Sequence, residues 1–122
     1  MFEARERLDA FVDGVGKLGE AMPDTITTMM AFMEAAEAPG ALTRREKELI
    51  AIGVIAYHRC EDCVAVHVRK ALEAGATRAE ILEAAGVAMV FGGGPSLAAT
   101  AGLLLPAIET YEAELAAEAA AE

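Results

Sequence analysis

Residues 43–80, TRREKELIAIGVIAYHRCEDCVAVHVRKALEAGATRAE, decide the fold because they hold two helix-start signals with a helix-stop signal before the second. Thr43-Arg-Arg-Glu46 and Thr77-Arg-Ala-Glu80 both match the capping box, in which a threonine oxygen and a glutamate carboxylate satisfy free backbone amides. Gly75 suits the left-handed conformation that commonly follows the end of a helix. This punctuation, with no sustained alternation of the strand type, predicts an all-α fold with short glycine or proline turns.

The distance between these signals bears on the two cysteines of the chain. About 30 residues separate them, which is long for one helix in a small domain. We therefore expect a break just before Cys60, although no glycine or proline marks it, and a helix from there to about Ala74. With the break, Cys60 stands at a helix amino terminus, where free amides and the helix dipole favour a thiolate. A continuous helix would remove that stabilisation.

Two further helices are expected before this stretch. The first covers about Phe2 to Leu18, and the second begins at Pro23-Asp24 and ends at Pro39-Gly40. The second helix carries Met29, Met30 and Met33. Methionines at helical spacing usually fill gaps between packed helices, so we interpret these three as core residues.

After the second capping box, the sequence from Ile81 to Phe91 is apolar on nearly every helical face, which predicts burial against other helices or another subunit. Gly92-Gly93-Gly94-Pro95 should then stop the helix in a tight turn. A phosphate-binding loop would also need a lysine after the glycines and a strand before them. A last helix should begin near Ser96 and be kinked or joined at Pro106.

Length, charge and the amino-terminal residues limit the class of protein. The 122 residues suit one domain spanning 1–122. A formal net charge of −10 argues against nucleic acids and anionic membrane surfaces as partners. The first residues are charged, and no stretch of about 18 uninterrupted apolar residues occurs, so we expect a soluble cytoplasmic protein. In that compartment a close cysteine pair is more often catalytic or metal-binding than structural.

Cys60, Cys63 and His67 carry the clearest chemical signal. Their spacings of three and four put two thiols and an imidazole on one helical face. The two cysteines can close into a disulfide with little backbone movement. The imidazole can accept the proton of Cys63, which makes Cys63 the better-activated thiol, and Cys60 can then convert an oxidised Cys63 into a disulfide. A helix-terminal position would instead activate Cys60.

The order of these residues resembles that of a known family. Glu48, then Cys60-x-x-Cys63-x-x-x-His67, then Ala-Gly-Ala-Thr at 74–77 is similar to the AhpD-like alkylhydroperoxidases of the carboxymuconolactone decarboxylase superfamily. The likeness covers about residues 42–99. It implies an all-helical bundle that assembles into trimers or hexamers. It also implies an antioxidant peroxidase activity in which Cys63 attacks the peroxide, Cys60 resolves it, and Glu48 and His67 relay the proton.

The resemblance also gives a reason to single out Glu48, which spacing alone does not. A carboxylate hydrogen-bonded to His67 would fix the tautomer of the ring and raise its basicity. No cofactor is implied. The substrate would be a hydroperoxide or a disulfide, and the reductant a thioredoxin-like or lipoyl-bearing partner.

The chain departs from one familiar version of the motif, in which a histidine lies between the cysteines. Here Glu61-Asp62 occupies that place, and two acids beside the thiols should disfavour a thiolate. His58 precedes the pair, and we interpret it as a partly exposed bystander.

The residues leave four alternative functions. The same dithiol could reduce protein disulfides without peroxidase activity. Two thiolates and an imidazole, with Glu48 or water as the fourth ligand, could bind zinc in a non-enzymatic helical module, but the chain has no second cysteine pair. Lactone or decarboxylation chemistry, as in the founding enzymes of the superfamily, is disfavoured by the cysteine pair. A helical scaffold with merely buried cysteines is the fourth.

Overall fold

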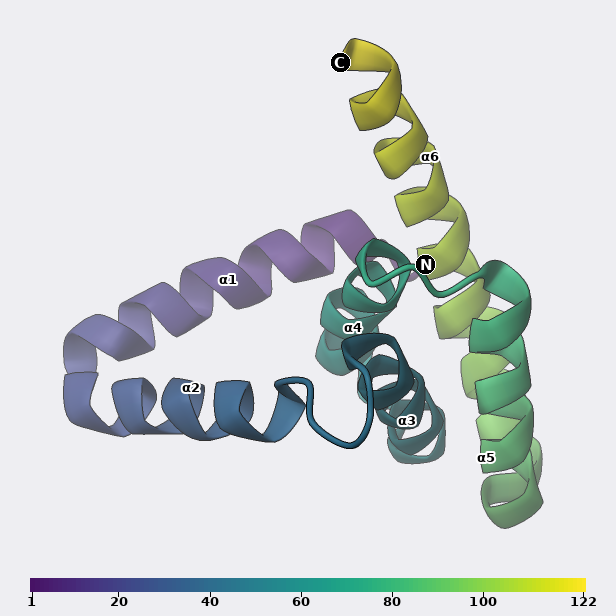
Figure 1. The fold of residues 1–122 in the computed structure, drawn as a ribbon, viewed down its shortest axis with the longest axis horizontal. Coiled ribbons are helices and arrows are strands. Elements are labelled where there is room, and N and C mark those ends of the chain that lie inside the picture. Colours follow the sequence, from purple (N-terminus) through teal and green to yellow (C-terminus); the bar gives the residue numbers. More distant parts are fainter.

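The computed structural model describes residues 1–122, all of whose regular elements are helical. The elements are α1 (Ala4–Ala21), α2 (Pro23–Glu37), α3 (Arg44–His58), α4 (Glu61–Glu73), α5 (Arg78–Ala99), the π-helical segment η1 (Thr100–Leu104) and α6 (Leu105–Ala121). In Figure 1, α3 to α6 gather around one centre, and α1 and α2 form a hairpin that extends to one side. The predicted all-α class is confirmed.

Both predicted capping boxes are present. Thr43 Oγ1 accepts a hydrogen bond from the Glu46 amide at 3.1 Å, and Glu46 Oε1 accepts one from the Thr43 amide at 2.8 Å. Thr77 and Glu80 repeat this geometry at 3.1 Å and 2.9 Å. Hydrogen bonding from the cap threonine lowers the pKa of each glutamate below its usual value. Gly75 takes the expected positive φ, +95°. These local signals therefore fix where α3 and α5 begin.

The predicted break before Cys60 is confirmed, and Arg59 makes it. This residue has φ 60° and ψ 36°, a left-handed conformation that glycine usually supplies, and its amide donates to the carbonyl oxygen of Ile55 at 2.6 Å. Because α3 ends at His58, Cys60 becomes the amino-terminal cap of α4. The turn sends α4 back alongside α3.

The core forms around α4. Fully buried side chains from five elements meet there: Val64 and Val68 of α4, Ile52 of α3, Ile81 of α5, Leu104 of η1, and Ile108 and Tyr111 of α6. The hydroxyl of Tyr111 lies 2.5 Å from the carbonyl oxygen of Ala65 and 3.3 Å from that of Ala4. Burial raises the pKa of Tyr111 to about 12, so this hydroxyl stays a donor at neutral pH. Tyr111 thus joins α6 to α4 and to the start of α1.

Two arginines surround Tyr111 and share one carboxylate. Arg5 of α1 lies 2.5 Å from Glu114 Oε1, and Arg69 of α4 lies 2.8 Å from the same oxygen. Both guanidinium groups lie over the Tyr111 ring, 5.7 Å and 5.8 Å from its centroid. Hydrogen bonding from Arg5 lowers the pKa of Glu114. This network anchors the first turn of α1.

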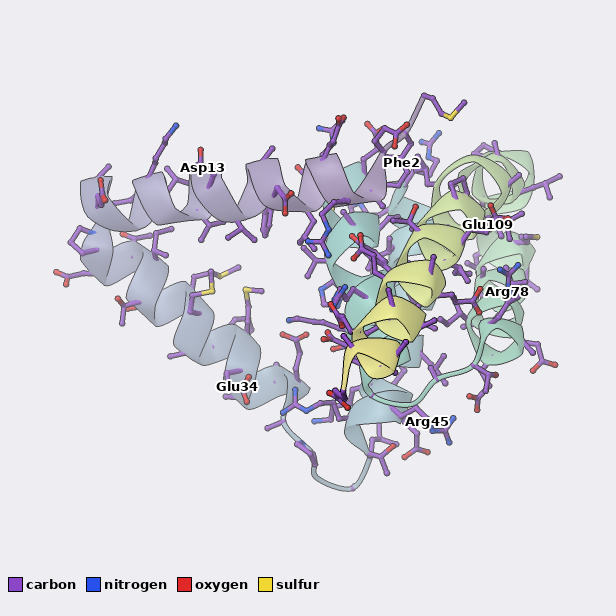
Figure 2. All side chains as sticks on the ribbon, turned by 90° about the horizontal axis from the view of Figure 1, so that it is seen from above. Phe2, Asp13, Glu34, Arg45, Arg78 and Glu109 are labelled. Carbon is purple, nitrogen blue, oxygen red and sulfur yellow. A yellow bond between two sulfur atoms is a disulfide. The ribbon has the colours of Figure 1, made fainter.

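Two expectations for the amino-terminal half need correction. The first helix runs from Ala4 to Ala21 rather than from Phe2 to Leu18. The interpretation of the α2 methionines as core residues was wrong: Met29 is 50% and Met30 41% exposed, and α2 contains no buried residue. The reason is tertiary, because α2 packs mainly on α1 within a hairpin that extends from the body, as Figures 1 and 2 show.

The glycine run in the carboxy-terminal half bends its helix and does not end it. Gly93 has φ 56° and ψ −138°, and helical backbone resumes on its far side up to Ala99. The expected stop is therefore a kink, which only glycine tolerates without strain. Pro106 lies at a join as predicted, in the first turn of α6 after η1.

The apolar run from Ile81 to Phe91 is only half buried. Ile81, Ala85 and Ala88 enter the core, whereas Val87 is 62% and Phe91 77% exposed. With residues of α3, this outer face lines an apolar groove of about 680 Å³, which we call the α3–α5 groove. By length and composition, the helical stretch Arg78–Ala121 could cross a membrane, with a mean hydropathy of 1.5 in its most apolar window. The same stretch supplies Ile81, Leu104 and Ile108 to the core.

Candidate active site

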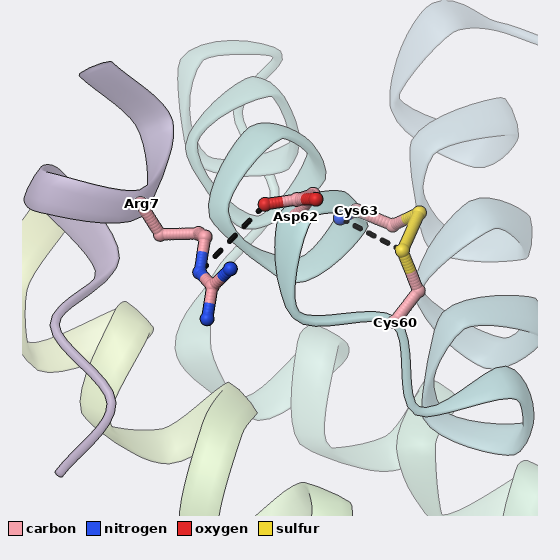
Figure 3. Close-up of a disulfide and its surroundings, with 4 residues drawn as sticks. All are labelled: Arg7, Cys60, Asp62 and Cys63. Carbon is pink, nitrogen blue, oxygen red and sulfur yellow. Dashed lines mark hydrogen bonds and ion pairs between the residues drawn. A yellow bond between two sulfur atoms is a disulfide. The ribbon is translucent and has the colours of Figure 1, made fainter. Parts of the chain in front are cut away.

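Cys60 and Cys63 form a disulfide at the amino terminus of α4, with their Cα atoms 5.2 Å apart. Figure 3 shows the bond beside the first turn of this helix. Cys60 has an extended backbone, and its Sγ lies 3.2 Å from the backbone nitrogen of Cys63, whose N–H it accepts. Free first-turn amides carry partial positive charge, and they stabilise a sulfur anion in this position. The geometry therefore suits a thiol that must ionise.

Glu48 and His67 are brought together by the pairing of α3 with α4. The Nδ1 atom of His67 lies 2.8 Å from Oε2 of Glu48, whose side chain is only 2% exposed. An ionised carboxylate can only accept, so the proton of this bond sits on Nδ1. The Nε2 atom is then the one ring nitrogen free to accept a proton. His67 shares a helical face of α4 with Cys63, four residues earlier.

Glu37 is a third member of this cluster that sequence reasoning missed. Its Oε1 lies 3.8 Å from His67 Nδ1 and 3.7 Å from Lys70 Nζ, and it is buried without a hydrogen-bond partner. Glu37 is the last residue of α2, about 30 positions before His67, so only the docking of α2 places it here. One weak signal was available, because a carboxylate in the last turn of a helix opposes the helix dipole.

Donor atoms of Glu37, Glu48 and His67 all lie within 4.8 Å of one another, a set that could hold a divalent cation. Lys70 already supplies a positive charge to this cluster through Glu37. The two-cysteine and histidine zinc set considered above is not assembled in this state, because both sulfurs are used by the disulfide.

The remaining predicted residues flank the cysteine pair. His58 is exposed at the end of α3, as expected of a bystander. Glu61 and Asp62 occupy the first turn of α4, and Arg7 of α1 lies opposite both acids. The site therefore comprises a disulfide at a helix terminus, a histidine held by a buried carboxylate, and charged residues at the rim.

The family of the chain follows from its similarity to known proteins. A family model described as carboxymuconolactone decarboxylase family matches residues 23–105, more than half of the chain. The chain belongs to the carboxymuconolactone decarboxylase family. The matched range includes the cysteine pair, Glu48 and His67, and it excludes all of α1. AhpD-like alkylhydroperoxidases belong to the same superfamily, so the resemblance noted from the sequence is confirmed at this level.

Two solved structures have a similar fold. A crystal structure of a carboxymuconolactone decarboxylase family protein from Legionella pneumophila, in its apo form, matches with a TM-score of 0.84 and 31% identity. It covers 88% of this chain and 96% of that one. A Thermotoga maritima protein matches with a TM-score of 0.69 and 26% identity, over 89% of this chain and 96% of that one.

Two curated relatives are about one third identical to this chain. A protein of Cupriavidus necator, described as uncharacterized, is 34% identical over 93 residues, which are 76% of this chain and 82% of that protein. A protein of Paracoccus denitrificans, described as uncharacterized protein 4 in the cox locus, is 35% identical over 74 residues, which are 61% of this chain and 67% of that protein. The carboxymuconolactone decarboxylase family includes enzymes, and a specific reaction has to be argued from this chain's own site.

Proposed function

We propose that this family member is a thiol-dependent redox enzyme that reduces hydroperoxides through a Cys60–Cys63 dithiol and disulfide cycle. The observation that carries the proposal is the arrangement on α4: a cysteine pair closed at its amino terminus, and on the same helix a histidine whose Nδ1 is held by buried Glu48. A fixed tautomer leaves Nε2 as the base, which is what thiol activation requires.

The first step forms a sulfenic acid on Cys63. His67 Nε2 accepts the thiol proton, and the thiolate attacks the terminal oxygen of the hydroperoxide, so that an S–O bond forms while the O–O bond breaks. The leaving alkoxide takes the proton from His67 and departs as an alcohol. The sulfur is oxidised by two electrons and the peroxide is reduced by two.

The second step closes the disulfide, and the third reopens it. The thiol of Cys60 attacks the Cys63 sulfur, an S–S bond replaces the S–O bond, and water leaves. An external dithiol, carried by a thioredoxin-like or lipoyl-bearing protein, then supplies two electrons and two protons to regenerate both thiols. We place this cycle in the cytoplasm, where such reductants keep disulfides open.

A second candidate function is the reduction of protein disulfides, and one observation favours it. The Cys63 amide faces Cys60 Sγ at 3.2 Å, which stabilises a thiolate on Cys60 rather than on Cys63. In a disulfide reductase, Cys60 would attack the substrate disulfide and Cys63 would resolve the mixed disulfide.

Hydroperoxide consumption by the reduced enzyme, with dihydrolipoamide as electron donor, tests the proposal. The two histidines of the chain provide a matched pair. His67→Ala should lower the rate about 100-fold through loss of the general base, and His58→Ala should leave it unchanged. Equal effects of the two substitutions would reject His67 as the base. Wild-type reduction of insulin disulfides without hydroperoxide consumption would reject the peroxidase in favour of the second candidate.

A further inference from the structure

Arg7 reaches from α1 to both acids that precede Cys63. Its Nη2 lies 3.3 Å from Oε2 of Glu61, and its Nε lies 3.7 Å from Oδ1 of Asp62. Figure 3 shows Arg7 pointing toward Asp62 at the end of α4 that carries the disulfide. Arg7 lies outside the residues 23–105 that match the family model. This contact therefore belongs to the part of the chain that the family match does not cover.

The position of Arg7 is fixed by the anchored start of α1. Ala4, one turn earlier, is buried in the core, and Tyr111 and Glu114 hold the neighbouring residues against α4 and α6. An ion pair between anchored helices loses less side-chain and backbone freedom than one on a mobile segment. Arg7 is thus held beside the first turn of α4 by the anchored first turn of α1.

The charges at this helix end are unfavourable to a thiolate unless they are offset. Glu61 and Asp62 are the first two residues of α4 and directly follow Cys60. Other ionisable groups near this end are Glu3 just before α1, Glu6 of α1, His58 and Arg59 at the end of α3, and His67 of α4. Of the two nearby arginines, only Arg7 pairs with the first-turn acids. Nearby negative charge disfavours ionisation of a thiol, and a cation at the same place opposes that effect.

We propose that Arg7 is a positioning residue for the redox reaction: by offsetting the charges of Glu61 and Asp62, it raises the thiolate population of the reduced cysteine pair. The inference rests on the proposed dithiol cycle. That cycle needs an ionised thiol, which the two acids disfavour. In place of a histidine between the cysteines, the chain has two acids, and a cation from another helix compensates them. A more populated thiolate makes the reduced pair faster toward electrophiles. It also makes the disulfide easier to reduce.

The pH dependence of alkylation tests this inference without using any peroxide. Fully reduced protein is treated with iodoacetamide across a pH series, and mass spectrometry locates the modified cysteine. Arg7→Gln should slow alkylation at neutral pH about threefold, the size expected for a partly exposed ion pair, and move the alkylation midpoint to higher pH. Arg7→Lys should restore most of the rate. The same loss should appear as a disulfide that glutathione reduces less readily.

Two controls separate a charge effect from a merely structural one. Adding Glu61→Gln and Asp62→Asn to Arg7→Gln should return the rate to at least the wild-type value, since no uncompensated acid then remains. Arg44→Gln is the matched control, because Arg44 is about as exposed as Arg7 and pairs with Glu34 at the same 3.3 Å, at the end of α3 far from the cysteines. It should leave alkylation unchanged, and high salt should shrink the effect of Arg7→Gln.

The outcomes for the two proposals are distinguishable. Superposable alkylation profiles for wild type and folded Arg7→Gln, in an enzyme that does reduce hydroperoxides, would overturn the role of Arg7 and leave the function standing. A rate that Arg7→Lys and the triple substitution both fail to restore would overturn it as well. A shifted profile in a protein that consumes no hydroperoxide would leave the charge effect standing and remove the peroxidase.

Discussion

The Nδ1 atom of His67 and the Oε2 atom of Glu48 lie 2.8 Å apart, in a place where the carboxylate is almost completely shielded from water. A buried carboxylate is costly unless its charge is bonded, so the histidine and the glutamate stabilise each other. The bond also fixes which ring nitrogen can act as a base. The effect expected of substituting Glu48 depends on this relationship.

Glu48→Gln should slow hydroperoxide reduction by about 100-fold, because an amide no longer fixes the His67 tautomer by accepting from Nδ1 alone. The rate of a single turnover, measured by stopped flow, is the readout. Glu37→Gln is the matched control, since Glu37 lies 3.8 Å from the same nitrogen without a hydrogen bond. A wild-type rate for Glu48→Gln, or an equal loss for both variants, would contradict the assigned role.

Arg59→Gly should stabilise the protein by roughly 0.5–1 kcal/mol, because glycine adopts the left-handed conformation of Arg59 without the cost that a side chain adds. Arg59→Val should destabilise it by about 1 kcal/mol or more, since a branched side chain is strained at φ 60°. Urea unfolding gives both values. A destabilising glycine together with a tolerated valine would mean that α3 and α4 are not separated at this residue.

Glu114→Gln should cost about 1 kcal/mol at neutral pH, where the carboxylate pairs with Arg5 and Arg69. The Arg5 hydrogen bond holds the pKa of Glu114 below the usual glutamate value of 4.5. Its stabilisation is therefore complete above pH 4.5 and is lost as pH falls through the lower folded-state pKa. Denaturant unfolding at several pH values should show the difference from wild type shrinking in acid. Glu109→Gln, an exposed change on the same helix, should show no such trend.

We propose that the exposed α3–α5 groove packs against further copies of the chain. Val87→Glu places a charge in this groove and should therefore convert an oligomer into smaller species. Exposed apolar patches of this kind usually mark an interface. Sedimentation at micromolar concentration should give trimers or hexamers for wild type and a monomer for the variant. Val12→Glu on α1 is the control, because Val12 is 61% exposed and lies outside the groove. A monomeric wild type, or dissociation by Val12→Glu alone, would contradict this location.

The features that could be predicted from sequence are those encoded within a few residues. Both capping boxes, the cap at Gly75 and the join at Pro106 depend on local backbone chemistry, and each lies where its residues indicate. The break before Cys60 followed from helix length rather than from a residue type. Residue types alone do not indicate the break, because Arg59, and not a glycine, takes the left-handed position.

The features that could not be predicted depend on how distant elements dock. Nothing local distinguishes exposed Met29 from a core methionine, because the outcome depends on what α2 packs against. Glu37 and Arg7 reach the site only because the end of α2 and the start of α1 dock near α4. Glu48 was singled out through a family resemblance, since a glutamate in a charged helix start is otherwise unremarkable in sequence.

The most direct test of the central claim is mass spectrometry of thiol-blocked protein after one stoichiometric pulse of an organic hydroperoxide. Wild type, Cys63→Ser and Cys60→Ser are compared, each fully reduced beforehand. We predict that wild type loses two hydrogens as the disulfide closes, that Cys60→Ser retains one added oxygen on Cys63, and that Cys63→Ser stays unmodified. The opposite pattern, with oxygen trapped on Cys60, or no oxidation of wild type within minutes, would contradict a peroxide-reducing cycle that begins at Cys63.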